Sequence, residues 1–289
     1  GTPLDGLPPP ELPGAETEPA FALDGTPLTC SPDGADSEGI AARRDGLFWI
    51  AEEYGPSLLL TDETGLVLRR LIPEGSAARY AGSRVPVVEA LPAIAAARKL
   101  NRGFEALAMS PDQATLYLAF QSPLAHPDRA AHDAASVVRI WALDALTGAF
   151  RGEYAYPLDP PASFRRDCAA GVVAANDIKV SELAVLDDGS LLVLERVTLS
   201  THLYRVTLGE PVRPEFIDPA HRPTLEQVGR GAVSLLAKVR VFSSDEQPDL
   251  CGDLEGLIVL DDGSLLLSND SDYGTEGAET QFWRVTPGG

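Results

Sequence analysis

The chain has 289 residues, of which 44% are hydrophobic, a composition typical of a globular protein with a sizeable core. No segment approaches the roughly 18–20 apolar residues needed to cross a bilayer. The net charge of −20 repels nucleic acids and anionic membranes, which excludes them as partners, and it attracts cations.

The first 30 residues are rich in Pro and Gly and predict an irregular N-terminal strap with one candidate strand at residues 20–23. The strap begins at Gly1 without an apolar signal segment, which we interpret as a processed terminus. Over the whole chain, 26 Gly and 24 Pro residues separate short apolar runs. Turns in such number favour many strands over long helices.

A motif of similar length then occurs four times, at intervals of roughly 70 residues. Its first copy reads Asp-Ser-Glu-Gly at residues 36–39, turns at an Asp-Gly pair and continues in an apolar strand. Strand, Asp-Gly turn and strand together predict a β-hairpin. The four copies run from Glu38 to Glu53, from Glu105 to Gln121, from Glu182 to Glu195 and from Glu255 to Asp270.

A second hairpin follows most copies, for example at residues 137–144 with 148–154, and its apolar side chains lie on both strand faces. Such sheets need covering on two sides, which radial stacking provides. The sequence therefore predicts an all-β fold, a single β-propeller domain over residues 1–289 with five or six blades of four antiparallel strands. A degenerate further blade is expected around residues 237–242.

Two segments, residues 71–100 and 122–136, interrupt the repeats as insertions. Residues 90–99 of the first predict a short helix, and the second reads as an exposed loop around His126 and His132. The three cysteines, Cys30, Cys168 and Cys251, lack the spacing of a zinc site or a redox dithiol. One disulfide with a leftover thiol and three separate thiols both fit.

In a propeller, equivalent positions of the inner strands converge on the axis, so the motif glutamates are brought together. Glu182 is out of step: aligned on its Asp-Gly turn, it falls one residue later than Glu38 and Glu255, which would turn it to the opposite face. Counted from the turn glycine, Glu52, Glu195 and Asn269 are equivalent strand-end positions.

Several carboxylates around one axis raise one another's pKa, so protons, arginines or a metal must neutralise them. Candidate arginines are Arg102, Arg139 and Arg196. Oxygen ligands without His or Cys suit Ca²⁺; simple hydrogen bonding to turn amides is the alternative. The expected metal ligands are Glu38, Glu53, Glu105, Glu255, Asn269 and Asp270.

The sequence has no Gly-x-Ser-x-Gly, His-Glu-x-x-His or phosphate-loop motif. Hydrolysis, if the protein performs it, would then rely on the metal. We expect Glu52, Glu195, Arg102 and Arg196 to be catalytic, and Asn101, Gln121 and the same two arginines to bind substrate.

These motifs resemble the phytase-like family, also described as the esterase-like activity of phytase family. The resemblance covers about residues 33–285 and includes Asp-Ser-Glu-Gly-Ile-Ala at 36–41, Asn-Arg-Gly-Phe-Glu at 101–105, Leu-Glu-Arg at 194–196 and Leu-Glu-Gly-Leu at 254–257. It implies a propeller, an exported bacterial protein in the periplasm or outside the cell, and a hydrolase.

Three hypotheses follow. The first is a calcium-dependent hydrolase of a small phosphate ester or carboxylic ester at the channel mouth. The second is a lactonase-like propeller, in which one divalent ion polarises a ring ester. The third is a non-catalytic binding propeller with structural calcium.

Overall fold

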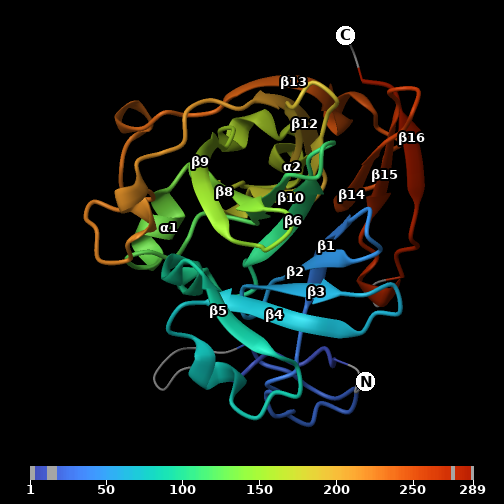
Figure 1. Cartoon of the computed structure of the whole chain (residues 1–289). Coiled ribbons are helices and arrows are strands. Elements are labelled where there is room, and N and C mark those ends of the chain that lie inside the picture. The colour runs from blue at the N-terminus through green and yellow to red at the C-terminus, as the bar shows by residue number, and fades with distance from the viewer. Residues whose placement is uncertain (1–3, 12–17, 275–276, 288–289) are drawn as a thin grey trace.

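The computed structural model describes residues 4–11, 18–274 and 277–287, so parts of the predicted strap, residues 1–3 and 12–17, lie outside the described residues. The described chain forms four β-sheets connected by short helices and loops (Figure 1). Strands follow chain order within every sheet.

The first two sheets contain the strands up to residue 157. The first is built from β1 (Ser37–Ala42), β2 (Phe48–Glu52), β3 (Ser57–Thr61), β4 (Val67–Pro73) and β5 (Val87–Leu91), of which β5 runs parallel to β4. The second is built from β6 (Phe104–Met109), β7 (Thr115–Phe120), β8 (Val137–Asp144) and β9 (Phe150–Pro157).

The last two sheets complete the order. The third is built from β10 (Lys179–Val185), β11 (Leu191–Arg196), β12 (Thr201–Thr207) and β13 (Ala237–Ser243). The fourth is built from β14 (Leu254–Val259), β15 (Leu265–Asn269) and β16 (Phe282–Val285).

The helices of the described chain are short. The α-helices are α1 (Arg129–Ala134) and α2 (Arg165–Ala170). The 3₁₀ helices are η1 (Ala77–Tyr80), η2 (Ala93–Ala97), η3 (Pro161–Ser163), η4 (Ala175–Asp177), η5 (Pro214–Ile217), η6 (Arg230–Ala232), η7 (Ser244–Glu246) and η8 (Asp272–Gly274).

The sheets are arranged as propeller blades, because their first strands pack side by side in the order β1, β6, β10 and β14 (Figure 1). This confirms the predicted all-β propeller class. The blade number differs from the expectation: the described residues form four blades, and residues 237–242 lie in β13, the outer strand of the third. Most of the preceding segment instead covers the second blade, where Val212, Phe216 and Leu225 pack on Val137 and Ala155.

Tight turns connect each inner strand to the next. Gly189 and Gly263 of the Asp-Gly turns have φ of 81° and 79°, in the left-handed region where glycine has no steric penalty. The second blade has no glycine there, and Gln113 takes the same conformation with φ of 59°. The second blade thus keeps the same turn conformation without the Asp-Gly pair.

The core lies between the blades and covers both faces of the middle strands, as the apolar pattern predicted. Every residue of β3 and of β11 is buried. Phe104, Phe120 and Trp141 pack edge to face with ring centroids 4.9–5.7 Å apart, an arrangement that adds about 0.5–1.5 kcal/mol per pair beyond area burial. Phe104 is thereby fixed immediately before Glu105.

The insertions differ in part from the expectation. The helix expected at residues 90–99 is the five-residue η2, and the residues before it form β5, since they pair with the backbone of β4. In the second insertion, His126 and His132 are buried rather than exposed, and His132 Nδ1 lies 2.7 Å from Pro123 O.

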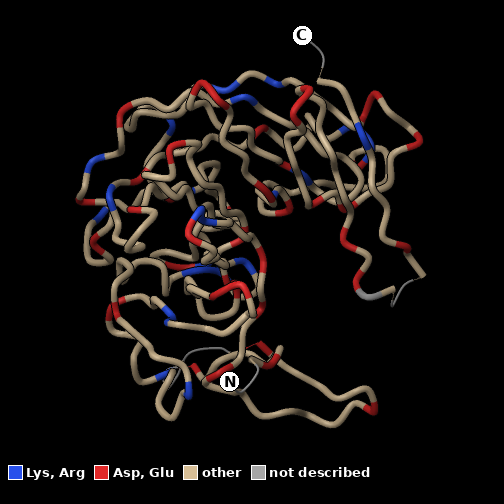
Figure 2. The backbone as a smooth tube through the Cα atoms, turned by 45° about the vertical axis from the view of Figure 1, so that its right-hand side comes forward, with Lys and Arg blue, Asp and Glu red and all other residues tan. Residues whose placement is uncertain are grey.

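Acidic residues are spread along the whole described chain (Figure 2). None of the three cysteines, all of which are described, forms a disulfide, which favours the separate thiols. Among the described residues, we find no helix with the length and apolar character required to span a membrane.

Candidate metal centre

The inner strands have equivalent starting positions, because each shows the same pairing irregularity. The register with the second strand shifts by one residue after Ser37, Phe104, Val180 and Leu254. Such a shift is a β-bulge, which re-aims a side chain. The positions that follow are Glu38, Glu105, Ser181 and Glu255. The residues that come next after their pairing partners Glu52, Phe120, Glu195 and Asn269 are Glu53, Gln121, Arg196 and Asp270.

The third copy of the motif is therefore displaced by one residue, in agreement with its spacing. Ser181, not Glu182, is the equivalent of Glu38. Glu182 Oε1 instead accepts a hydrogen bond of 2.8 Å from Leu183 N, and burial raises the pKa of Glu182 to about 8.

The first blade brings three carboxylates together. One oxygen from each of Asp36, Glu38 and Glu53 lies within 4.8 Å of the others. A backbone hydrogen bond of 3.0 Å from Glu53 N to Asp36 O holds the two chain segments side by side. Asp36 was not among the residues expected to bind metal.

The second blade adds Glu105 and Gln121 to this group. Gly103 permits the close approach of the two blades, since a Cβ on it would lie 2.0 Å from Glu53 O. We refer to the five side chains of Asp36, Glu38, Glu53, Glu105 and Gln121 as the axial cluster.

Three oxygens of the axial cluster are buried without a hydrogen-bond partner among the described residues: Glu53 Oε1, Glu105 Oε2 and Gln121 Oε1. The three residues are only 3–7% exposed. A buried polar atom left without a partner costs about 1–3 kcal/mol, and native proteins contain few of them. Because all three atoms are acceptors, a cation or a donor would satisfy them.

Burial and mutual repulsion raise the pKa values of this cluster. Burial, followed by the charge of Glu105, raises the pKa of both Glu38 and Glu53 to about 9. Burial and then the Glu52 carboxylate raise the pKa of Asp36 to about 6. Burial also raises the pKa of Glu105, against a lowering hydrogen bond from Gln121. A protein without a bound cation would therefore hold protons here at neutral pH.

In the part of the chain that the structure describes, no lysine or arginine forms an ion pair with a carboxylate of the axial cluster. Arg98 donates from Nε to the backbone oxygen of Glu53 at 3.2 Å and pairs through Nη2 with Glu11. Arg196 pairs with Asp253 at 2.7 Å and with Glu255. The expected metal ligand Glu255 thus has an arginine in direct contact, whereas Arg196 acts on Glu105 of the axial cluster through its charge alone.

The donor set of the axial cluster fits a hard divalent cation. It offers carboxylate and amide oxygens only, the ligands of Ca²⁺, which takes about 6–8 oxygens. Histidine and cysteine, which zinc and copper prefer, are absent from these five residues. The carboxylates of the cluster that lack an ion pair and its three buried oxygens that lack a hydrogen-bond partner among the described residues fit a hard cation as well.

Glu52 and Glu195, expected to be catalytic, lie at equivalent positions but in separate hydrogen-bond networks. Glu52 accepts from Ser57 Oγ at 2.8 Å and from Gly55 N at 3.2 Å. Glu195 accepts from Tyr156 OH at 2.6 Å and from Lys238 Nζ at 2.7 Å. These partners satisfy both carboxylates inside the protein, and we do not include them in the site.

The remaining expected residues surround the cluster at different depths. Arg102 donates from Nη1 to Asn176 O at 2.7 Å, and its Nε and Nη2 donate to no residue that the structure describes. Asn101 is exposed, and its backbone N donates to Glu18. Asn269 bonds to Gln281 N at 2.7 Å, and the exposed Asp270 still adds to the repulsion that raises the pKa values of Asp36 and Glu38.

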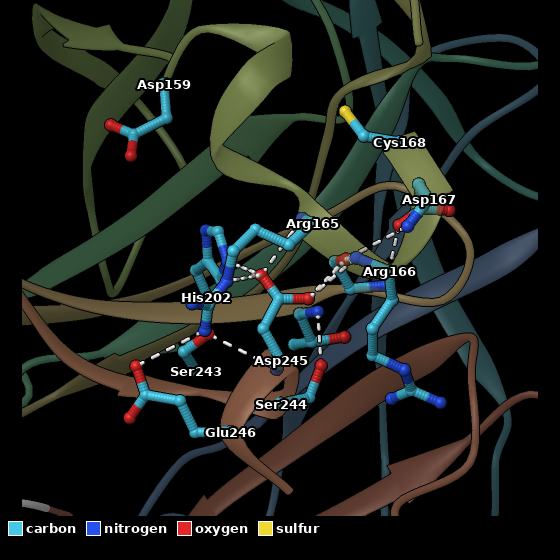
Figure 3. A network of polar contacts seen from close by, with 12 residues as sticks. Asp159, Arg165, Arg166, Asp167, Cys168, His202, Ser243, Ser244, Asp245 and Glu246 are labelled. Atoms are coloured by element: carbon cyan, nitrogen blue, oxygen red, sulfur yellow. Dashed lines mark hydrogen bonds and ion pairs between the residues drawn. The ribbon is translucent and has the colours of Figure 1, made fainter. Parts of the chain in front are cut away.

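A second polar network, centred on Asp245, ties α2 to η7 and β12 (Figure 3). Asp245 accepts from Ser200 Oγ at 2.7 Å, from Arg165 N and Arg166 N at 3.1 Å, and lies 3.3 Å from His202 Nε2. Against the effect of burial, the hydrogen bonds, that of Ser200 first, lower the pKa of Asp245 to about 2. Both carboxylate oxygens are satisfied, so this network stabilises the fold.

Comparison with known proteins gives one curated relative, an uncharacterized secreted protein of Arthroderma benhamiae, 28% identical over 225 residues. The match covers 68% of this chain, which spans 43% of that relative. Among solved structures, a protein of unknown function from Bacteroides caccae has a TM-score of 0.41 and 11% identity, covering 90% of this chain and 64% of the other.

The β-propeller domain of Cps50 (Swd1) from Myceliophteria thermophila has a TM-score of 0.37 and 12% identity, covering 82% of this chain and 62% of that one. Similarity at this level says nothing about activity. The family model described as "Phytase-like: Esterase-like activity of phytase" matches residues 12–273, nearly the whole chain. The protein therefore belongs to the phytase-like family, as its motifs predicted.

Proposed function

We propose that the protein is a calcium-dependent hydrolase of small esters, with the axial cluster as its metal centre. The observation that carries the proposal is the cluster of Asp36, Glu38 and Glu53, none of which forms an ion pair with a described residue. Three buried acceptor oxygens, on Glu53, Glu105 and Gln121, also lack a hydrogen-bond partner among the described residues. The family description, which names an esterase-like activity, supports hydrolysis as the reaction class.

In this proposal, Asp36, Glu38 and Glu53 hold the cation, and Glu105 and Gln121 complete its surroundings from the second blade. A bound divalent cation would polarise the ester carbonyl or phosphoryl oxygen and stabilise the charge that develops on it. Gln121 orients Glu105 through its amide. Arg102, with donors to spare beside Glu53 and Glu105, would bind the substrate.

Access favours a reactive site over a sealed structural ion. Asp36 and Glu38 are only partly buried, and Ser37 between them is exposed, whereas Glu53 and Glu105 close the inner side. A cation held there would keep one face towards solvent. Export from the cell, expected from the family resemblance, has the support of the relative that is named a secreted protein.

The test measures turnover of p-nitrophenyl phosphate, p-nitrophenyl acetate and a simple lactone, each with calcium and with chelator. We expect calcium-dependent turnover of at least one ester and a loss of about a hundredfold or more in Glu53→Gln, since a ligand to the cation is removed. Glu63→Gln, which removes the same charge from an exposed turn, is the control.

Each outcome bears on one reading. Turnover of the lactone alone would favour the lactonase-like hypothesis. Calcium binding without turnover of any substrate would make the ion structural and the propeller a binding protein. Turnover that survives both chelator and Glu53→Gln would contradict the proposal.

A further inference from the structure

The third blade reverses the charge of the inner-strand positions. Where the first and fourth blades carry Asp36 and Asp253, the third carries Lys179, paired in register with Arg196. Arg196 in turn occupies the position of Glu53, Gln121 and Asp270. The third blade therefore carries positive charge at two of these inner positions, Lys179 and Arg196.

The two cations of this blade have different surroundings. Arg196 is saturated by Asp253, Glu255, Ser181 Oγ and Val197 O. Lys179 is partly buried, yet its ammonium has no ion pair or hydrogen bond to any described residue. An unpaired, half-buried lysine is notable in a chain of net charge −20.

Backbone contacts place Lys179 beside the axial cluster. Val180 N, one residue on, donates to Gln121 O at 2.8 Å. Arg102, which lies just before the first strand of the second blade, donates a hydrogen bond to the backbone oxygen of Asn176, three residues before Lys179. Burial lowers the pKa of Lys179, and repulsion from Arg196 and Arg102 lowers it further, so these cations lie within electrostatic reach of one another.

Glu105 and Lys179 act on each other through their charges, each favouring the ionised form of the other. No ion pair within 4.0 Å joins the two side chains, so the Lys179 ammonium is not held by a direct contact to Glu105. Within the described ranges, none of the three ammonium donors of Lys179 and neither Nε nor Nη2 of Arg102 donates a hydrogen bond. These donors lie next to the axial cluster, so an anionic ligand could accept hydrogen bonds from them while another of its oxygens contacts the cation at the cluster.

We propose that Lys179 and Arg102 form an oxyanion subsite that binds a phosphate or carboxylate group of the ligand beside the metal centre. The proposal rests on the function proposed above, which supplies the cation at the axial cluster. It identifies Lys179 as a specificity residue: the ligand carries a negative charge of its own, and a neutral ester lacks this contact.

The experiment measures binding by calorimetry to the calcium-loaded full chain and, in parallel, in chelator. Phenylphosphonate and benzoate serve as non-hydrolysable probes of the phosphate and carboxylate classes. We expect Lys179→Met to weaken binding of the preferred probe about tenfold or more, as for loss of a hydrogen bond to a charged group. Lys179→Arg should restore most of the affinity.

Calcium affinity gives a readout that a merely structural lysine would not reproduce. Removing a positive charge beside the axial cluster should leave calcium binding unchanged or tighter while anion binding weakens. Arg213→Gln removes the same charge from a side chain that is 64% exposed and should change neither.

Two results would overturn the subsite: no binding of either probe to the wild type, or equal probe affinity in Lys179→Met and wild type. Failure of the proposed function appears separately, as absent turnover of every ester or as turnover that survives chelator, while the binding comparison remains measurable. A larger loss for phenylphosphonate identifies phosphate as the group bound, and a larger loss for benzoate identifies carboxylate.

Discussion

Two groups of buried glutamates in this molecule are built in opposite ways. In the second blade, Arg139 donates from Nη1 to Glu153 at 2.8 and 2.9 Å and from Nε and Nη2 to Glu226 at 2.8 and 3.0 Å. Trp141 Nε1 adds a further bond of 2.8 Å to Glu153. In the axial cluster, Glu53 and Glu105 are equally buried, yet each has an oxygen without a partner among the described residues.

The two groups differ in whether the buried carboxylates have a cation in direct contact within the chain. A buried carboxylate is tolerated when a cation and hydrogen bonds compensate it, and it is strongly unfavourable otherwise. Arg139, Glu153 and Glu226, here called the arginine triad, compensate one another's charges within the chain, so the triad needs no ion from solution. In the axial cluster, the charges of Arg98, Arg196 and Lys179 act on Glu53 or Glu105 without forming an ion pair with a described carboxylate of the cluster. A cation from solution would supply the direct counter-charge.

The largest effect is expected where compensation is internal. Arg139→Met would strand Glu153 and Glu226 without a cation, and we expect the free energy of unfolding to fall by about 3–5 kcal/mol. Urea denaturation with and without calcium measures it, and calcium should not restore the loss. Arg205→Met, from a pair with Asp188 whose side chains are about half exposed, should cost less than about 1 kcal/mol. Equal losses in the two variants would show that the triad does not stabilise the fold in this way.

The axial cluster should respond to pH in a way that the triad does not. Its folded-state pKa values for Glu38 and Glu53, about 9, lie above those of an unfolded chain. At these two groups the folded protein binds more protons than the unfolded one, so their contribution to stability is complete below pH 4.5 and is lost as pH rises towards 9. Thermal melts in chelator should show this fall.

Calcium should abolish most of this pH dependence, because a bound cation favours the ionised carboxylates. Glu105→Gln, which removes one charge from the cluster, should make the melting temperature in chelator less dependent on pH and should weaken the stabilisation by calcium. Stability in chelator that rises between pH 5 and 9 would contradict the assignment of uncompensated carboxylates.

Much of the fold could be predicted from local pattern. The strand expected at residues 137–144 is β8 with the same bounds, because a nearly continuous apolar run between flanking turns defines it. β5 could not be predicted, since it is an edge strand that depends on parallel pairing with β4. The expected fifth blade was wrong because residues 237–242 have a strand-like pattern whose partner, β12, only tertiary structure determines.

The candidate site could be predicted in part, because the repeat fixes some of its positions and tertiary structure fixes the others. The repeat predicted that Glu38, Glu53, Glu105 and Gln121 would occupy related positions, and register pairs place them so. Asp36 and Lys179 were missed because only the structure shows which charges have a partner. Asp36 joins carboxylates that form no ion pair with a described cation. Lys179 is a cation that forms no ion pair with a described carboxylate. Their signal in the sequence was position: each lies two residues before the residue at the bulge, Glu38 or Ser181.

The smallest effect concerns Asp270, which was expected to bind the metal. It is exposed, its Oδ1 accepts a hydrogen bond from Asp272 N at 2.9 Å, and it acts on Asp36 and Glu38 through its charge. Asp270→Asn should therefore weaken calcium affinity only about two- to threefold at low salt, and added salt should remove the difference, because exposed charges are screened. Asp262→Asn, at an exposed outer turn, should leave the affinity unchanged. A loss of tenfold or more that persists in high salt would instead make Asp270 a ligand and extend the metal centre to the fourth blade.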